Sequence, residues 1–151
     1  MTETAYTGGC QCGAIRFRAQ SVGRASICHC RMCQKAFGAF YGPFVTAHGL
    51  EWTRGGPKHF VSSSLVNRGF CGDCGTPLTY EWEGREAEIA IGAFDEPSRI
   101  APVIQVNPAD KLPFVDGLPA LPERPAQASD FAGIVSYQHP DHDTAEWPAK
   151  R

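Results

Sequence analysis

The chain alternates hydrophobic and polar positions in several short stretches, and each of them predicts a strand. In residues 14–19 the side chains of Ile15 and Phe17 are expected to face a core, whereas Arg16 and Arg18 are expected to face solvent. Similar short apolar stretches recur along the first two thirds of the sequence. The other predicted strands are residues 40–46, 50–53, 59–63, 78–82, 88–93 and 103–106.

Glycine and proline separate these stretches and leave little room for helix. A short helical turn is expected over residues 31–36, where Gly38 would end it. Gly42 and Pro43 lie inside the strand that follows, and proline cannot donate a ladder hydrogen bond, so an edge strand or a bulge is expected there. Residues 83–85 are the expected loop of a hairpin. The predicted fold class is therefore mostly β with little helix.

The C-terminal part has a different composition. From Asn107 onward prolines recur too often for a helix and predict an extended, wrapping segment. We expect one domain over residues 1–125 and a tail over residues 126–151. The tail contains histidines and aspartates at residues 139–143 that could bind a surface metal, although a mobile or partner-contacting tail is the stronger expectation. Oligomeric state stays open, and a homodimer is one arrangement that would order such a tail.

Length and charge limit the function classes. A chain of 151 residues is expected to form one domain. Its formal net charge of -2 and its 20% of charged residues argue against a nucleic-acid binder, which normally has a basic excess. Residues 1–7 contain neither a basic start nor an apolar run, so we expect no signal peptide, no membrane span and a reducing, cytoplasmic location.

The cysteines are the clearest chemical signal in the sequence. All seven fall into three closely spaced motifs, and their odd number argues against a purely disulfide framework. Thiolates are soft ligands that suit zinc, so we expect two zinc sites, one closed to solvent by four cysteines and one left open with three. Any two of the three motifs could pair, or one pair could be oxidised. The motifs are Cys10 with Cys12, Cys28 with Cys30 and Cys33, and Cys71 with Cys74.

An open three-cysteine site would favour thiol chemistry. Three thiolates around one zinc leave a charge of roughly -1, which suits binding of a further thiolate better than formation of hydroxide. That thiolate would attack an electrophilic carbon. His29 lies between two of the cysteines, so its ring is poorly placed as a fourth ligand, and water or a substrate thiolate is expected instead. Two alternatives stay open: a fourth protein ligand with no chemistry, or a redox-sensitive thiol cluster without metal.

The motifs together resemble those of the glutathione-dependent formaldehyde-activating enzyme family, which also includes centromere protein V. The resemblance covers residues 7–125, and two positions depart from the family pattern: Gln105 replaces a usual histidine and Phe114 a frequent tryptophan. The matching segments, in order, are residues 9–13, 28–33 followed by Gly38, 68–76 and 116–119.

This resemblance implies a fold, a ligand arrangement and an activity. The fold would be a zinc-held β-tent, meaning small antiparallel sheets around a structural zinc. The activity would be condensation of formaldehyde with glutathione to S-(hydroxymethyl)glutathione, a carbon–sulfur lyase reaction with two zinc ions and glutathione as co-substrate. The implied ligands are Cys10, Cys12, Cys71 and Cys74 for the structural zinc, and Cys28, Cys30 and Cys33 for the open one.

Candidate substrate contacts lie in or beside the cysteine motifs. Glutathione has two carboxylates, which arginine, lysine and amide side chains could bind, although solvated surface positions are the alternative for each. The sequence therefore predicts an enzyme whose partners are a small thiol and an electrophile. The alternative is a non-catalytic zinc module for protein contacts. The candidate contacts are Arg31, Gln34, Lys35 and Arg68.

Overall fold

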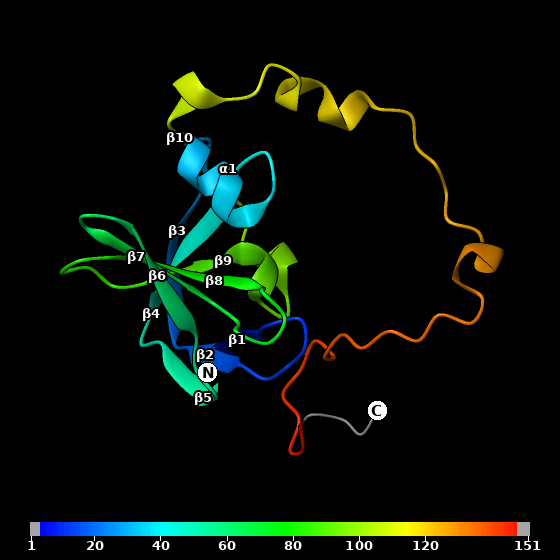
Figure 1. Cartoon of the computed structure of the whole chain (residues 1–151), viewed down its shortest axis with the longest axis horizontal. Coiled ribbons are helices and arrows are strands. Elements are labelled where there is room, and N and C mark those ends of the chain that lie inside the picture. The colour runs from blue at the N-terminus through cyan, green and yellow to red at the C-terminus, as the bar shows by residue number, and fades with distance from the viewer. Residues whose placement is uncertain (1–3, 148–151) are drawn as a thin grey trace.

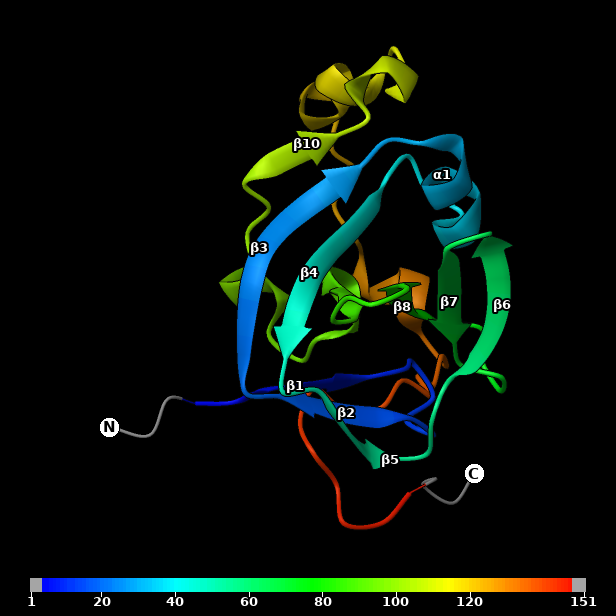
Figure 2. The same cartoon turned by 90° about the vertical axis from the view of Figure 1, so that its left-hand side faces the viewer.

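The computed structural model describes residues 4–147 and confirms a mostly β fold (Figures 1 and 2). One sheet has three strands in the order β1-β2-β5, and the other has seven in the order β10-β3-β4-β9-β8-β7-β6. The strands are β1 (Tyr6–Gly9), β2 (Arg16–Ala19), β3 (Ser21–Cys28), β4 (Gly42–His48), β5 (Glu51–Arg54), β6 (Lys58–Ser63), β7 (Val66–Phe70), β8 (Pro77–Trp82), β9 (Glu88–Ala90) and β10 (Ile104–Val106).

Within residues 4–147, helical structure is limited to one short α-helix and five 3-10 turns. The α-helix α1 (Arg31–Phe37) ends at Gly38, whose φ of 59° places it in the left-handed region that favours glycine, as the sequence predicts. No helix among residues 4–147 is long and apolar enough to cross a membrane. The 3-10 turns are η1 (Ile91–Ala93), η2 (Pro97–Arg99), η3 (Pro108–Asp110), η4 (Val115–Ala120) and η5 (Ala128–Phe131).

The core lies where the two sheets face each other. Phe17 of the small sheet is fully buried and makes edge-to-face contacts with Trp52 and Phe94, whose ring centroids are 6.0 and 5.1 Å away. Leu78 and Ile89 of the large sheet are equally buried in the same cluster. Truncating a buried residue such as Phe17 to alanine would cost about 3–5 kcal/mol, so this packing contributes strongly to the stability of the core.

Several strands lie where the alternation predicts them. β5, β6, β8 and β10 agree with their predicted ranges to within one residue, and β8 pairs with β9 as the predicted hairpin. The edge strand expected at Pro43 is wrong, because β4 lies between β3 and β9. Pro43 is the second residue of β4 and lies opposite Ile27 of β3, and pairing with β9 begins only at Phe44. The missing N–H of proline therefore interrupts no bond to β9. The register shift between β3 and β4 falls elsewhere, between Val22 and Ala25.

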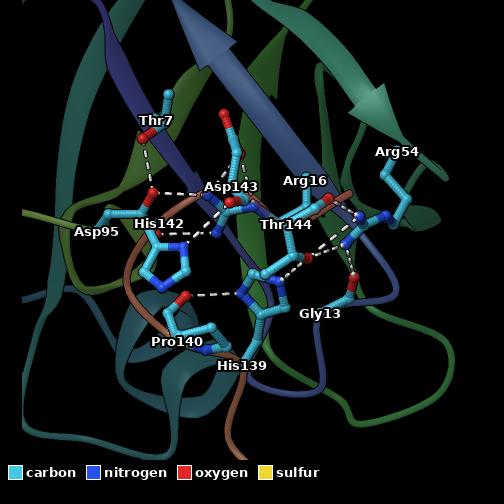
Figure 3. Close-up of polar contacts among 10 residues, drawn as sticks. All are labelled: Thr7, Gly13, Arg16, Arg54, Asp95, His139, Pro140, His142, Asp143 and Thr144. Carbon is cyan, nitrogen blue, oxygen red and sulfur yellow. Dashed lines mark hydrogen bonds and ion pairs between the residues drawn. The ribbon is translucent and has the colours of Figure 1, made fainter. Parts of the chain in front are cut away.

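The burial of Arg16 also differs from the sequence prediction. The residue was expected to face solvent, but only 3% of it is exposed. Its guanidinium donates to both carboxylate oxygens of Asp95, at 2.8 and 2.6 Å, and to Asp143 at 2.7 Å (Figure 3). A buried guanidinium is stable when paired in this way. Alternation alone could not show this, because both partners are distant in sequence.

The segment after residue 107 forms an extended arc away from the sheets, as its prolines predict, and then returns to the small sheet (Figure 1). There the His139 backbone N–H donates to the Gln11 carbonyl at 2.8 Å. Arg54 donates to the Thr144 carbonyl at 2.5 Å (Figure 3). His139 is buried, and its Nε2 bonds with the Thr144 hydroxyl at 2.9 Å. A mobile tail is therefore wrong for this part, which we name the strap (residues 138–144).

Candidate metal centres and the adjoining pocket

The first cysteine cluster joins the two sheets. Its four Sγ atoms all lie within 4.8 Å of one another. The Cys10 and Cys12 sulfurs are 3.5 Å apart, and those of Cys12 and Cys71 are 3.8 Å apart. Sulfurs at 2.3 Å from one tetrahedral zinc would be about 3.8 Å apart, so this spacing fits a single ion. The cluster consists of Cys10, Cys12, Cys71 and Cys74.

Two turns shape this cluster. Gly13 and Gly75 follow the paired cysteines and both have a φ of 79°, which a residue with a side chain rarely adopts. The Thr76 hydroxyl lies 3.1 Å from the Cys74 sulfur. Although burial acts to raise it, hydrogen bonds from Thr76 help to lower the pKa of the Cys74 thiol to about 6. Cys74 is exposed, so the expected closure to solvent is wrong on that side of the cluster.

The second cluster lies at the opposite end of the large sheet. Cys28 ends β3, Cys30 is the N-cap of α1 and Cys33 lies in its first turn, and their Sγ atoms are again within 4.8 Å of one another. Each sulfur accepts at least one hydrogen bond: Cys28 from Asn107 at 3.3 Å, Cys30 from the Cys33 N–H at 3.4 Å, and Cys33 from Arg68 at 3.3 Å. Hydrogen-bond donors of this kind are common around metal-bound sulfurs.

Hydrogen bonding between the thiols of the second cluster shifts their pKa values in opposite directions. A hydrogen bond from Cys33 is the main cause that lowers the pKa of the Cys28 thiol to about 5, against the effect of burial. The same contact, together with burial, raises the pKa of Cys33. Without a metal, Cys28 therefore carries a thiolate at neutral pH. All seven cysteines of the chain are free.

His29 does not join the second cluster. Its ring is buried, and its Nε2 lies 2.8 Å from the Oε1 of Gln105, the residue that replaces a histidine of the family pattern. Because an amide oxygen accepts, Nε2 donates in this hydrogen bond. The metal-ligating group contains only the three cysteines among residues 4–147, so an open fourth position fits this side-chain arrangement.

A pocket of about 670 Å³ opens beside the second cluster. One wall is formed by the three cysteines, and most of the rest by residues of the large sheet, from β10 at one edge to β6 at the other. Arg68 is only 4% exposed and donates to Ser62 at 2.9 Å as well as to Cys33. Its guanidinium carbon lies 5.0 Å from the ring centroid of Tyr80. Its Nη1 makes no hydrogen bond within residues 4–147 and is buried.

The predicted substrate contacts divide into three groups. Arg68 lines the pocket and is not a solvated surface residue. Gln34 is buried, but its amide donates to the His29 and Asp110 carbonyls at 2.7 and 3.1 Å, and its oxygen accepts from Arg31. It therefore supports the cysteine loop and does not face the pocket. Arg31 and Lys35 are exposed and lie outside the pocket lining.

Sequence reasoning missed the other polar residues of the pocket. Tyr80, Glu88 and the arginines Arg24 and Arg85 all line it. The hairpin of β8 and β9 was predicted, but the alternation did not show that the face with Tyr80 and Glu88 borders a pocket. Burial raises the pKa of Tyr80, so its phenol stays protonated and can donate.

Comparison with known families agrees with this geometry. The model of the glutathione-dependent formaldehyde-activating enzyme family matches residues 5–109, which include all seven cysteines. The chain belongs to this family. The resemblance seen in the sequence is thereby confirmed for this range, whereas the segment 116–119 lies beyond the match.

Solved structures add evidence for the fold of this family member. A crystal structure of a Rhodobacter sphaeroides protein is similar with a TM-score of 0.53 and 19% sequence identity. The similarity covers 66% of this chain and 99% of that chain. At this identity it supports the fold alone. No curated protein sequence matches the chain.

Proposed function

We propose that this family member is a zinc-dependent carbon–sulfur lyase-type enzyme that forms S-(hydroxymethyl)glutathione from formaldehyde and glutathione or acts on a related small-thiol adduct. The observation that carries the proposal is the three-cysteine cluster, whose sulfurs line the large pocket. Family membership supports the pairing of formaldehyde with glutathione.

The donor sets fit two zinc ions with different roles. In the proposal, the four-cysteine cluster holds a structural zinc that joins the sheets. The three-cysteine cluster holds the second zinc, which when bound would offer a fourth position where a thiol loses its proton readily. Hydrogen bonds from Asn107 and Arg68 orient two of the three sulfurs, as outer contacts commonly do at metal sites.

Arg68 is the residue best placed to assist the reaction. The substrate thiolate attacks the carbonyl carbon, so a carbon–sulfur bond forms and the electron pair of the C=O bond moves to oxygen. The unpaired Nη1 of Arg68 would donate a hydrogen bond to that oxygen as its charge develops. The oxygen then takes a proton from water in the open pocket, which balances the proton that the thiol released.

The test is catalysis by the zinc-replete full chain. Formaldehyde and glutathione also combine without a catalyst, so NMR exchange spectroscopy at equilibrium would measure how much the protein speeds the exchange. We expect acceleration by the wild type and at least about a 10-fold loss in Arg68→Met, in which one transition-state donor is removed. Absence of acceleration by zinc-loaded wild type would contradict the proposal and favour the non-catalytic zinc module.

A further inference from the structure

One row of three side chains lines the pocket, and the proposed reaction step uses only one of them, Arg68. The strand register places Arg68 of β7 opposite Tyr80 of β8, and Tyr80 opposite Glu88 of β9. All three line the pocket. Neighbouring strands are about 4.8 Å apart, so the backbone of Glu88 lies roughly 10 Å along the row from that of Arg68, whose side chain contacts the Cys33 sulfur. The row therefore joins the cysteine cluster to a carboxylate.

Glu88 has no cation to neutralise it directly. Its carboxylate makes no hydrogen bond or ion pair with any of residues 4–147, and the residue is half-buried. Burial raises its pKa, and the nearby guanidinium groups of Arg24 and Arg85 act against that rise without bonding to it. A partly desolvated carboxylate is costly without a charged or donor partner. Such a group is well suited to bind a cation of the substrate.

Two arginines flank the same end of the pocket. Arg24 follows Gly23 within the register shift between β3 and β4, and it is exposed at the pocket wall. Arg85 is also exposed and lies over the Trp82 ring, 5.1 Å from its centroid. A carboxylate with arginines beside it presents both charges that an amino-acid zwitterion requires.

We propose that Glu88 binds the free α-ammonium group of the thiol substrate, while Arg24 and Arg85 bind the adjacent α-carboxylate. This inference rests on the proposed function and deepens it. The pocket would select thiols whose sulfur and α-ammonium group are far apart. Roughly eight bonds separate these two groups in a γ-glutamyl-cysteinyl thiol, and an extended chain of that length spans about 9 Å. In cysteine roughly three bonds separate them, so the ammonium group cannot reach Glu88 while the sulfur is at the cluster.

The test compares thiols before it compares variants. The zinc-replete full chain is assayed by the same exchange method with glutathione and with glutathione acetylated on its α-amine. Loss of the charge-assisted contact should raise KM about 10- to 100-fold for the acetylated thiol, with kcat nearly unchanged. Because this comparison uses wild-type protein, it does not depend on how a variant folds.

Two variants complete the test. Glu88→Gln should raise KM for glutathione by the same factor and leave KM for the acetylated thiol unchanged. Glu86→Gln is the matched control, because Glu86 is exposed, bonds with His48 at 2.8 Å and lies outside the lining of this pocket. It should change neither value.

The results of this test distinguish a failure of the inference from a failure of the proposed function. Equal KM values for the two thiols in the wild type, or a fall in kcat of Glu88→Gln with both thiols, would overturn the inference while leaving the proposed function intact. Absence of wild-type turnover with either thiol would overturn the proposed function and this inference with it.

Discussion

The two cysteine clusters use the same ligand atom in different surroundings. The four-cysteine cluster lies between the sheets, and the strap (residues 138–144) passes beside it. The three-cysteine cluster lies at the end of β3, accepts hydrogen bonds from polar side chains and lines the pocket of about 670 Å³. Ligand type therefore does not distinguish a structural from a reactive site. In the proposal, the number of sulfurs does: four at the structural site and three at the open one.

The largest effect is expected from a break in the four-cysteine cluster. Cys74→Ala removes one of the four clustered sulfurs that we propose hold a structural zinc, and such a zinc commonly supplies about 10 kcal/mol or more of apparent folding free energy. We expect an insoluble or unfolded protein, measured by solubility and circular dichroism. A well-folded variant with its full zinc content would refute the structural role.

A break in the three-cysteine cluster should leave the fold intact. Cys30→Ser removes a ligand from the N-cap of α1, outside the core between the sheets. Native mass spectrometry should show one zinc instead of two, with the melting temperature lowered by only a few degrees and exchange catalysis reduced more than about 100-fold. Unfolding comparable to that of Cys74→Ala would mean that the two clusters do not differ in role.

The buried ion pair between Arg16 and Asp95 is expected to stabilise the small sheet. Arg16→Met leaves the carboxylate of Asp95, whose side chain is only 7% exposed, without its cation, and should lower the free energy of unfolding by about 3–5 kcal/mol. Asp143→Asn is the control on the other partner, whose side chain is 57% exposed, and should cost less than about 1 kcal/mol. Urea unfolding measures both, and equal losses would contradict this assignment.

The same pair predicts a pH dependence. Burial acts to raise the pKa of Asp95, but hydrogen bonds from Arg16 and Thr7 hold it below its ordinary value of 3.8. A carboxyl with a lowered folded-state pKa stabilises the protein above its ordinary pKa, and this contribution disappears as the pH falls through the folded-state value. The stability difference between wild type and Asp95→Asn should therefore shrink below about pH 4. A difference that stays constant in urea titrations at lower pH would disprove the coupling.

The smallest effect is expected from removal of the strap. A chain that ends at residue 137 loses the bonds of Asp143 and Thr144 to Arg16 and Arg54, which should cost about 1–2 kcal/mol. A chelator should then remove zinc faster from the four-cysteine cluster, next to which the strap lies, than it does in the full chain. The rate for the three-cysteine cluster should stay the same. Faster zinc loss from the three-cysteine cluster alone would contradict the placement of the strap beside the four-cysteine cluster.

Local signals account for what the sequence predicted correctly. Gly38 after α1 and the hairpin loop at residues 83–85 are turn features that depend on a few neighbouring residues. The cysteine motifs, as a set, indicated the family, because their order and spacing are specific to it.

Long-range pairing accounts for what the sequence missed. Arg16 followed the alternation of a solvent-facing residue, yet its acidic partners lie 79 and 127 positions away. Pro43 suggested an edge strand because proline cannot donate a ladder hydrogen bond. The local sequence does not show that pairing between β4 and β9 begins only at Phe44, beyond the proline. Glu88 became visible as a pocket residue only once the register placed it opposite Tyr80.

Cadmium NMR of the protein with cadmium in place of zinc would test the contrast between the clusters most directly. The account predicts two signals. Addition of glutathione should leave the four-sulfur signal unchanged and move the other toward the shift of an all-sulfur site, because only the three-cysteine cluster has a position for the substrate sulfur. If glutathione shifts neither signal, or if it shifts the four-sulfur signal, the claim that only the three-cysteine cluster binds the substrate sulfur is contradicted.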